Sequence, residues 1–334
     1  MTRGRAVGLE APDPVLEAEL RQRLDQVEAS LERAVRSDTE FVTRAASYLV
    51  AAGGKRFRPM LVLLGGYFGD PTDPRLIHGA TAIEIVHLAT LYHDDVIDEA
   101  ETRRGRPSVN AQWGNNVAIL TGDFLFARAS EISAELGTEV SRLLAQTIAV
   151  LCDGQIREVE MAGRFDHSEE AYMEVIRRKT AKLIATSSRL GGMLSGAPEQ
   201  VVERLDEVGT ALGMAFQLSD DIMDVVAGPE ELLKEPGQDM REGVYTLPVL
   251  YALRDGEAGR ELARILAQGP PQGERLRRAL EIVRQDGSLG RAREAVTVWV
   301  RRAKAAARPL PASRARDALV HVADYLARRC GARA

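Results

Sequence analysis

Apolar residues recur at helical spacing along most of the 334-residue chain. The first such run follows Asp13 and Pro14, a capping residue and a first-turn proline. Its apolar positions step by four or three and are Leu16, Leu20, Leu24, Val27 and Leu31. The same spacing predicts helices over residues 39–52, 59–67, 74–98, 116–136, 138–161, 168–194 and 198–225, and shorter ones from residue 247 to the C-terminus.

Strand patterns do not accompany these helices. No stretch alternates apolar and polar residues between hairpin turns, so we expect no sheet. Two connections are long and polar, residues 99–115 and 227–246, and loops of that length are often functional lids. The predicted fold class is therefore all-α: a single large helical bundle with a central cavity, formed by residues 13–334 behind a flexible N-terminal segment, residues 1–12.

Composition narrows the class of protein. Apolar residues make up 45% of the chain, enough for a large core, and a net charge of −5 argues against nucleic acid as a partner. The two cysteines, Cys152 and Cys330, lack metal-binding spacing and are expected to be reduced thiols. No run of 18 apolar residues and no apolar leader occur, so we expect a cytoplasmic protein without a transmembrane segment that could still contact a membrane surface.

The sequence Asp-Asp-x-x-Asp occurs twice, each time at the end of an apolar helical segment. The first copy is Asp94, Asp95 and Asp98, and the second is Asp220, Asp221 and Asp224, 126 residues further on. Residues four apart share one face of a helix, so the outer aspartates of each copy repel each other. A bound cation would remove this repulsion, and carboxylates on a rigid wall suit Mg²⁺ when water and phosphate supply its other ligands. One copy could be a solvated helix end, but two favour a metal site.

Basic residues lie near both acidic motifs in the sequence. Lys55, Arg56 and Arg58 follow two glycines, Arg103 and Arg104 come after the first motif, Lys179 lies within a predicted helix, and Lys234 comes after the second motif. Arginine binds diphosphate through its bidentate fork and lysine binds it as a point charge. Any one of these cations could be a solvated surface charge. Together with the acidic motifs they favour a diphosphate substrate.

Five motifs, in order, resemble the trans-polyprenyl diphosphate synthases. They are Gly-Gly-Lys-Arg-x-Arg-Pro at 53–59, His-Asp-Asp-Val-Ile-Asp at 93–98, Arg-Arg-Gly at 103–105, Lys-Thr at 179–180 and Phe-Gln-x-x-Asp-Asp-x-x-Asp at 216–224. The likeness spans roughly residues 40 to 255. It implies the all-helical isoprenoid synthase fold, usually a homodimer, with both acidic motifs facing one deep cavity.

The resemblance also implies roles for individual residues. The six aspartates match those that hold three Mg²⁺ ions against the allylic diphosphate. Three further residues match basic residues that contact the allylic diphosphate: Arg103, Lys179 and Lys234. Four residues match the pocket that binds isopentenyl diphosphate: Lys55, Arg58, His87 and Arg104. Thr180 and Gln217 match residues beside the carbon where cationic charge develops. The loop after the second motif departs from the family pattern at Leu233 and Val244, which leaves one loop lysine missing.

The chemistry of the residues agrees with these roles. Mg²⁺ would neutralise the departing diphosphate, a dry cavity would protect the allylic cation from water, and basic residues would hold isopentenyl diphosphate over it. No general base stands out, and the resemblance implies that the released diphosphate takes the proton. His93 is a candidate base, but we favour a structural role for it.

Product length in this family depends on the depth of an apolar tunnel below the first motif. Ala89 and Thr90 precede Asp94 by five and four residues, about one helical turn, and both are small. We therefore expect a product of medium or long chain. Contact with a membrane surface could assist the release of such a product. A bulkier residue deeper down could instead close the tunnel, with Phe124 and Phe126 as candidates, as in a short-chain (farnesyl or geranylgeranyl) synthase.

Two other functions remain open. A terpene cyclase shares the fold and first motif, but its second motif typically mixes Asn, Ser and Glu, and it lacks an isopentenyl pocket such as Lys55 and Arg58. A non-catalytic subunit of a heteromeric synthase tends to have degraded aspartate motifs, whereas both motifs are intact here.

Overall fold

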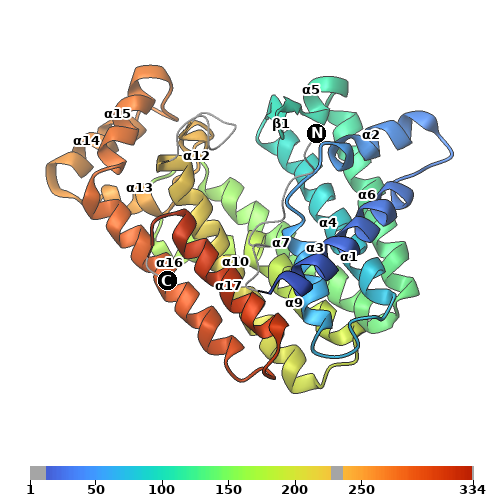
Figure 1. Ribbon diagram of the computed structural model, residues 1–334. Coiled ribbons are helices and arrows are strands. Elements are labelled where there is room, and N and C mark those ends of the chain that lie inside the picture. The colour runs from blue at the N-terminus through green and yellow to red at the C-terminus, as the bar shows by residue number, and fades with distance from the viewer. Residues whose placement is uncertain (1–12, 227–235, 333–334) are drawn as a thin grey trace. The chain divides into compact units, whose positions relative to one another are not determined.

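The computed structural model describes residues 13–226 and 236–332. The segment 1–12, expected to be flexible, and Lys234 lie outside the described residues. Nearly all regular elements are helices, drawn in chain order from blue to red in Figure 1, so the all-α prediction is confirmed. Within the described ranges, none of the helices combines the length and apolar character that crossing a membrane requires.

Contacts between residues divide the chain into two compact units. The first comprises residues 1–148, 183–209 and 306–322, and the second comprises residues 149–182, 210–305 and 323–334. Five helices contribute residues to both units: α7 (Thr138–Met161), α9 (Lys182–Leu194), α10 (Glu199–Val226), α16 (Asp286–Ala307) and α17 (Arg314–Arg329). A single domain over residues 13–334 stays a prediction.

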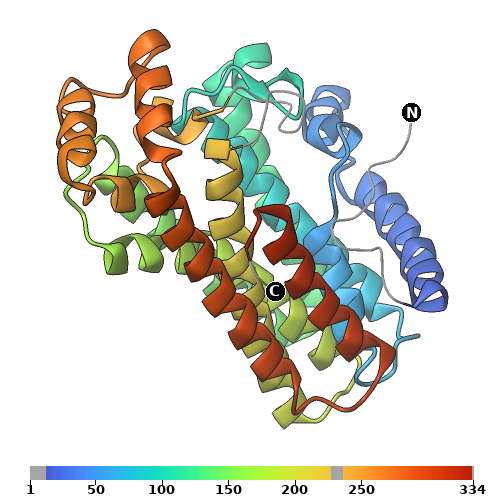
Figure 2. The same ribbon diagram turned by 60° about the vertical axis from the view of Figure 1, so that its left-hand side comes forward.

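The first unit is organised around α4 (Arg75–Ile97). The other elements that belong wholly to it are α1 (Pro14–Ala34), α2 (Glu40–Ala51), α3 (Phe57–Gly66), β1 (Thr102–Arg103), β2 (Arg106–Pro107), α5 (Val109–Trp113) and α6 (Asn115–Glu135). Contacts join α4 to α1, α3, α5 and α6, and α4 and α6 lie side by side in both views (Figures 1 and 2). Helix α4 is buried along much of its length, and this packing fixes the position of the aspartates at its C-terminal end.

The second unit contains the remaining elements. Those that belong wholly to it are α8 (Glu169–Ile176), the π-helix η1 (Arg177–Ala181), α12 (Gln238–Arg241), α13 (Leu247–Ala252), α14 (Gly256–Leu266) and α15 (Gly273–Val283). The helix predicted over 168–194 is thus interrupted by a π-helical turn, a feature that often marks a functional site. Hydrophobic spacing could not reveal this turn, because one added residue barely alters the pattern.

The expectation of no sheet is wrong in the segment 99–115. Thr102 pairs with Pro107 and Arg103 with Arg106 in a short antiparallel hairpin, and α5 follows. Arg104 and Gly105 at the turn both have positive φ, 53° and 72°, as a two-residue hairpin turn requires. Strands of two residues are too short to show the alternation by which a strand is predicted.

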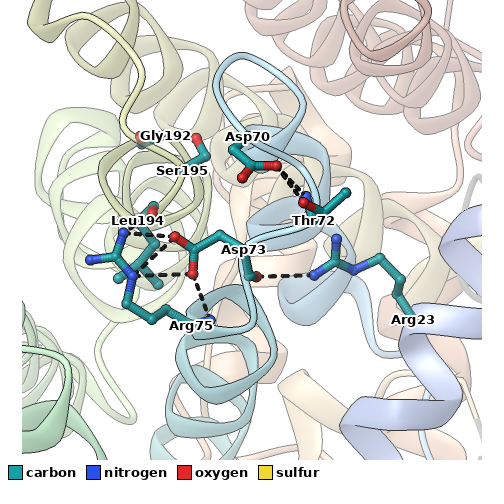
Figure 3. A network of polar contacts seen from close by, with 8 residues as sticks. All are labelled: Arg23, Asp70, Thr72, Asp73, Arg75, Gly192, Leu194 and Ser195. Atoms are coloured by element: carbon teal, nitrogen blue, oxygen red, sulfur yellow. Dashed lines mark hydrogen bonds and ion pairs between the residues drawn. The ribbon is translucent and has the colours of Figure 1, made fainter.

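The connection between α3 and α4 is held by a polar network (Figure 3). The backbone N–H of Asp70 donates to the carbonyl of Ser195 at 2.8 Å, and Nη2 of Arg75 donates to the carbonyl of Leu194 at 2.9 Å. Asp73 accepts from Arg75, and its carbonyl accepts from Arg23 of α1 at 3.3 Å. These bonds tie the start of α4 to α1 and to the end of α9.

Helices α3 and α9 pack at backbone contact. A Cβ atom at Gly65 would lie 2.5 Å from the carbonyl oxygen of Ser188 and 3.2 Å from Cα of Gly191. No side chain fits between these helices, so the glycines set their separation. The cation-bearing loop before α3 is positioned by this packing.

We expect Gly65→Ala to lower the free energy of unfolding by about 1–3 kcal/mol, because the added methyl group must push two backbones apart. Urea titration measures the change. Gly290→Ala is the matched control: it lies within α16, and its Cβ would have no heavy atom within 4 Å. This control should stabilise the protein slightly, by about 0.4–1 kcal/mol. Equal effects of the two substitutions would contradict the close packing of α3 and α9.

Candidate active site

The first acidic motif lies at the C-terminal end of α4. Asp94 and Asp95 belong to its last turn, and Asp98 caps the helix, with its N–H bonded to the carbonyl of Asp94 at 2.8 Å. Asp95 is fully buried and accepts from Nε of Arg103 at 2.6 Å. Burial alone would lower the pKa of Arg103, but the three aspartates raise it overall. The first acidic motif is therefore paired with a positively charged side chain of the same chain, that of Arg103.

The loop before α3 contains a buried arginine that the sequence did not single out for a role. Arg56 has φ of 46°, and its guanidinium donates to Glu84 of α4 at 2.7 Å and to Glu28 of α1 at 3.0 Å. Burial opposes its charge, but the two glutamates raise the pKa of Arg56. This pairing anchors the loop that carries Lys55 and Arg58. Lys55 is exposed there and Arg58 is half-buried.

Positive charge gathers around His87. Burial and four nearby guanidinium groups lower the pKa of His87 well below its usual value, so the imidazole is neutral at neutral pH; the groups are those of Arg58, Arg104, Arg56 and Arg103. Arg104 donates to the carbonyl oxygens of Leu49, at 2.9 Å, and of Gly53. Burial lowers the pKa of Arg104 as well. We call these four arginines and His87 the arginine cluster; an anion beside it would be stabilised.

His93 occupies a structural position. Its Nε2 lies 3.1 Å from the carbonyl of Ile119, and its ring centroid is 5.6 Å from that of Phe126. A Cβ atom at Gly122 would collide with the imidazole, so α6 carries a glycine where the ring packs. These contacts support the structural role favoured for His93.

The residues predicted to control product length lie on α4, one turn before the first motif. Ala89 is fully buried, and the half-buried Thr90 donates its hydroxyl to the carbonyl of His87 at 2.7 Å. Phe124 and Phe126 are half-buried on α6. A mainly apolar hollow of about 530 Å³ lies between α6 and α7, and its lining residues are Phe126, Ser130, Ser133, Ser141, Leu144, Ala145 and Ile148.

In the second unit a hydrogen-bond chain links three of the predicted residues. The hydroxyl of Thr180 donates to Oε1 of Gln217 at 2.8 Å, and Nε2 of Gln217 donates to Oδ1 of Asp221, also at 2.8 Å. The buried hydroxyl of Tyr172 donates to Oδ2 of Asp221. Thr180 belongs to η1, as does Lys179, whose ammonium group pairs with Glu158 of α7. The π-helical turn packs closely on α7, because a Cβ at Gly154 would lie 2.6 Å from the N atom of Lys179.

The carboxylates of the second motif have different surroundings. Asp224 accepts from the backbone N–H groups of Gln238 and Asp239 at 3.1 and 3.3 Å, and thus anchors the start of α12. Asp220 pairs with Arg329 near the end of α17. Burial, opposed in part by bonds from Tyr172 and Gln217, raises the pKa of Asp221 to about 7. Burial and the carboxylates of neighbouring acidic residues raise the pKa of Asp239 well above its usual range.

This donor set fits a divalent cation that shares its ligands with a substrate. All candidate ligands are hard carboxylate oxygens, and burial together with neighbouring carboxylates raises the pKa of Asp221 and of Asp239, a cost to the charged forms that a bound cation would offset. In the described part of the chain, no group of three or more His, Cys, Asp or Glu side chains is placed so that it could hold a metal ion.

Comparisons with known proteins decide the family. The polyprenyl synthetase family model matches residues 39–283. The chain belongs to this family. It is 43% identical over 328 residues to the nonaprenyl diphosphate synthase of Mycobacterium tuberculosis (strain ATCC 25618 / H37Rv), covering 97% of each chain. It is 48% identical over 248 residues to heptaprenyl diphosphate synthase component 2 of Geobacillus stearothermophilus, covering 74% of this chain and 77% of that one.

A solved structure extends the likeness to the fold. The geranylgeranyl pyrophosphate synthase of Corynebacterium glutamicum, complexed with calcium and isoprenyl diphosphate, is 42% identical, has a TM-score of 0.84, and is matched over 96% of this chain and 98% of its own. The predicted isoprenoid synthase fold and the predicted activity, trans-polyprenyl diphosphate synthesis, are confirmed by these comparisons.

For this polyprenyl synthetase, the structure brings together part of the predicted site. Within the first unit it gathers Arg58, His87, Arg103 and Arg104, and within the second it links Thr180, Gln217 and Asp221. Sequence reasoning missed Glu84, Glu158, Tyr172 and Arg329, because none belongs to a motif and each partner lies far along the chain. The two acidic motifs facing one cavity, the roles of individual residues and Lys234 stay predictions.

The raised pKa of Asp221 generates a pH prediction. Its folded-state pKa of about 7 exceeds the ordinary value of 3.8, so the folded protein binds more protons in this window. The stability that Asp221 contributes is fully present below pH 3.8, the pKa of the unfolded state, and is lost as the pH rises to about 7, the pKa of the folded state. A bound divalent cation needs the deprotonated carboxylates. The rise in Tm on adding Mg²⁺ should therefore be larger at about pH 8 than at about pH 6.

Differential scanning fluorimetry measures this difference, with NaCl at matched ionic strength as the control. An equal rise in Tm at both pH values would contradict competition between protons and metal at the second motif.

Proposed function

We propose that the chain condenses isopentenyl diphosphate with an allylic prenyl diphosphate, head to tail (1′-4) and in trans, to give a polyprenyl diphosphate of medium or long chain. The observation that carries this proposal is the presence of two intact Asp-Asp-x-x-Asp motifs together with the arginine cluster in a polyprenyl synthetase. A terpene cyclase would have no use for a second identical acidic motif or for a separate site for isopentenyl diphosphate.

The six aspartates are proposed to bind three Mg²⁺ ions, which would neutralise the departing diphosphate as the allylic C–O bond ionises. The homologue complexed with calcium and isoprenyl diphosphate supports divalent-metal use. Arg103, Lys179 and Lys234 are assigned to the allylic diphosphate. In the structure Arg103 already lies against the first motif, bonded to Asp95, where it could hold both the carboxylate and a metal-bound phosphate.

The second substrate is assigned to part of the arginine cluster, without Arg56 and Arg103, and to Lys55. Lys55, Arg58, His87 and Arg104 would bind isopentenyl diphosphate, because a group of cations around a neutral imidazole stabilises a multiply charged anion. Arg56 is already neutralised by two glutamates. It therefore holds the loop in place and leaves the other cations to offset the charge of the substrate.

Thr180 and Gln217 are proposed to lie beside the reacting carbon. Their oxygen atoms are joined by a 2.8 Å hydrogen bond that continues to Asp221, so their dipoles are fixed before the substrate binds. Fixed dipoles stabilise developing positive charge without reorganising during the reaction. This ordering gives a physical reason for the π-helical turn that carries Thr180.

The medium- or long-chain product rests on two observations. The 43% identical relative is a nonaprenyl diphosphate synthase, and Ala89 and Thr90 are small where a growing chain would pass. The hollow beside Phe126 offers apolar space further along α6. The alternative is a short-chain synthase, favoured by the geranylgeranyl relative, with Phe124 or Phe126 closing the tunnel.

Partner and location are part of the proposal. We infer a homodimer in the cytoplasm, with product released toward a membrane surface. A heteromeric assembly is the alternative, since one relative is a component of heptaprenyl diphosphate synthase. The intact aspartates argue that this chain would be catalytic in either assembly.

Labelled isopentenyl diphosphate, offered with primers of five, ten, fifteen and twenty carbons, tests the reaction. We expect Mg²⁺-dependent products longer than the primer. Asp94→Ala and Asp220→Ala should each lower kcat at least about 100-fold, because diphosphate departure loses charge stabilisation. Asp38→Ala, at an exposed position before α2, should leave kcat unchanged. Near wild-type turnover by folded Asp220→Ala would overturn the role of the second motif.

Ala89→Tyr tests chain-length control. A tyrosine at this buried position fills space that a long chain must occupy, and filled apolar space is not regained without strain. We expect products shortened to fifteen or twenty carbons, measured by chromatography after dephosphorylation. Ala89→Ser, of similar size, should keep the wild-type products. An unchanged profile for Ala89→Tyr, or a wild type that stops at fifteen carbons, would contradict an open tunnel at Ala89.

A further inference from the structure

The C-terminal helix brings a cation to the second acidic motif. Arg329, in the last turn of α17, donates from Nη2 to Oδ1 of Asp220, which lies 109 residues earlier in the chain. The guanidinium also lies over the ring of Phe216, 5.6 Å from its centroid. Phe216 precedes Asp220 by four residues and so shares its face of α10. Arg329 therefore runs along this face of α10 from the aromatic ring to the carboxylate.

The end of α17 is anchored so that the guanidinium stays there. Nε of Arg293 on α16 donates to the carbonyl of Cys330 at 2.9 Å, and Lys304 pairs with Asp324. The side chain of Arg329 is 14% exposed, whereas its neighbour Arg328 is exposed to solvent. The pairing with Asp220 is thus built into the packing of α17, unlike a chance contact between two mobile surface side chains.

The geometry of the pair permits exchange. One guanidinium nitrogen makes the hydrogen bond, while Nη1 of Arg329 is buried and has no hydrogen-bond partner among the residues that the structure describes. A bidentate Arg–carboxylate pair would be stronger and harder to open. The side chain of Asp220 is 46% exposed, so a cation from solvent can reach it.

We propose that Arg329 is the resident counter-cation of Asp220 and sets the affinity of the second motif for divalent metal. The proposal rests on the proposed function in one respect, namely that the second motif binds metal. Arg329 offsets one negative charge in a group of carboxylates whose mutual repulsion would otherwise destabilise the fold. A divalent ion that binds Asp220 must displace the guanidinium, so the arginine weakens metal binding while it stabilises the protein without metal.

Calorimetric titration with Mn²⁺, on the full-length chain without substrate, tests this role. Arg329→Met keeps an apolar stem over Phe216 but removes the charge. It should tighten Mn²⁺ binding about three- to tenfold and lower the Tm measured without metal. Arg329→Lys should restore both values toward wild type. Arg328→Met, a loss of one charge at the adjacent exposed position, should change neither.

The same substitution in an Asp220→Ala background separates the direct pair from a general charge effect. Arg329→Met should leave Mn²⁺ affinity unchanged there. An equal tightening with and without Asp220, or no tightening in the presence of Asp220, would overturn the proposal. Arg329→Ala is measured in parallel, so a neutral variant remains available if one does not fold. A wild type that binds no Mn²⁺ even with diphosphate would instead contradict the proposed function.

Discussion

Like charges held close together in partly desolvated surroundings are the constraint on which this structure depends. Carboxylates at the second motif and guanidinium groups around His87 each raise the free energy of the folded chain unless something offsets them. The protein offsets part of this cost internally, through Arg103 on Asp95 and Arg329 on Asp220. Under the proposed function, bound metal would offset further negative charge at the acidic motifs, and the diphosphate of the second substrate would offset positive charge around His87.

The helical scaffold makes this arrangement possible because its positions are set by close packing. Gly65 lets α3 approach α9 at backbone contact, and Gly154 lets α7 approach the π-helical turn that carries Lys179. Charged groups on rigidly packed helices cannot move apart, so the repulsion between like charges persists until a bound ligand offsets it. The same packing that stabilises the fold thereby prepares its binding groups.

The sequence predicted the helices and the acidic motifs well, because both depend on local spacing. The helices predicted over 74–98 and 138–161 correspond to α4 and α7 within a residue or two at each end. The π-helical turn and the Arg104–Gly105 hairpin escaped prediction, since neither changes the apolar period.

Ion pairs between residues far apart in the sequence could not be predicted, for a different reason. Arg56 could be identified as one of three cations, but its neutralisation by Glu28 and Glu84 depends on how α1 and α4 pack. Likewise, nothing near Arg329 in the sequence indicates a functional role. Its relevance follows from tertiary packing that places the end of α17 against Asp220. Motifs thus identified the acidic groups and Arg103, and only the fold identified Arg329 as the cation that pairs with Asp220.

The most direct test of this account is whether metal and diphosphate bind cooperatively. Calorimetry would measure the Kd of Mn²⁺ for the wild-type protein with and without inorganic diphosphate, corrected for binding of Mn²⁺ to diphosphate in solution. Under the proposed function, a metal ion bound by the acidic motifs has a diphosphate among its ligands, so diphosphate should tighten metal binding at least about tenfold. Equal affinities under both conditions would contradict the proposal that metal and diphosphate bind together at the acidic motifs.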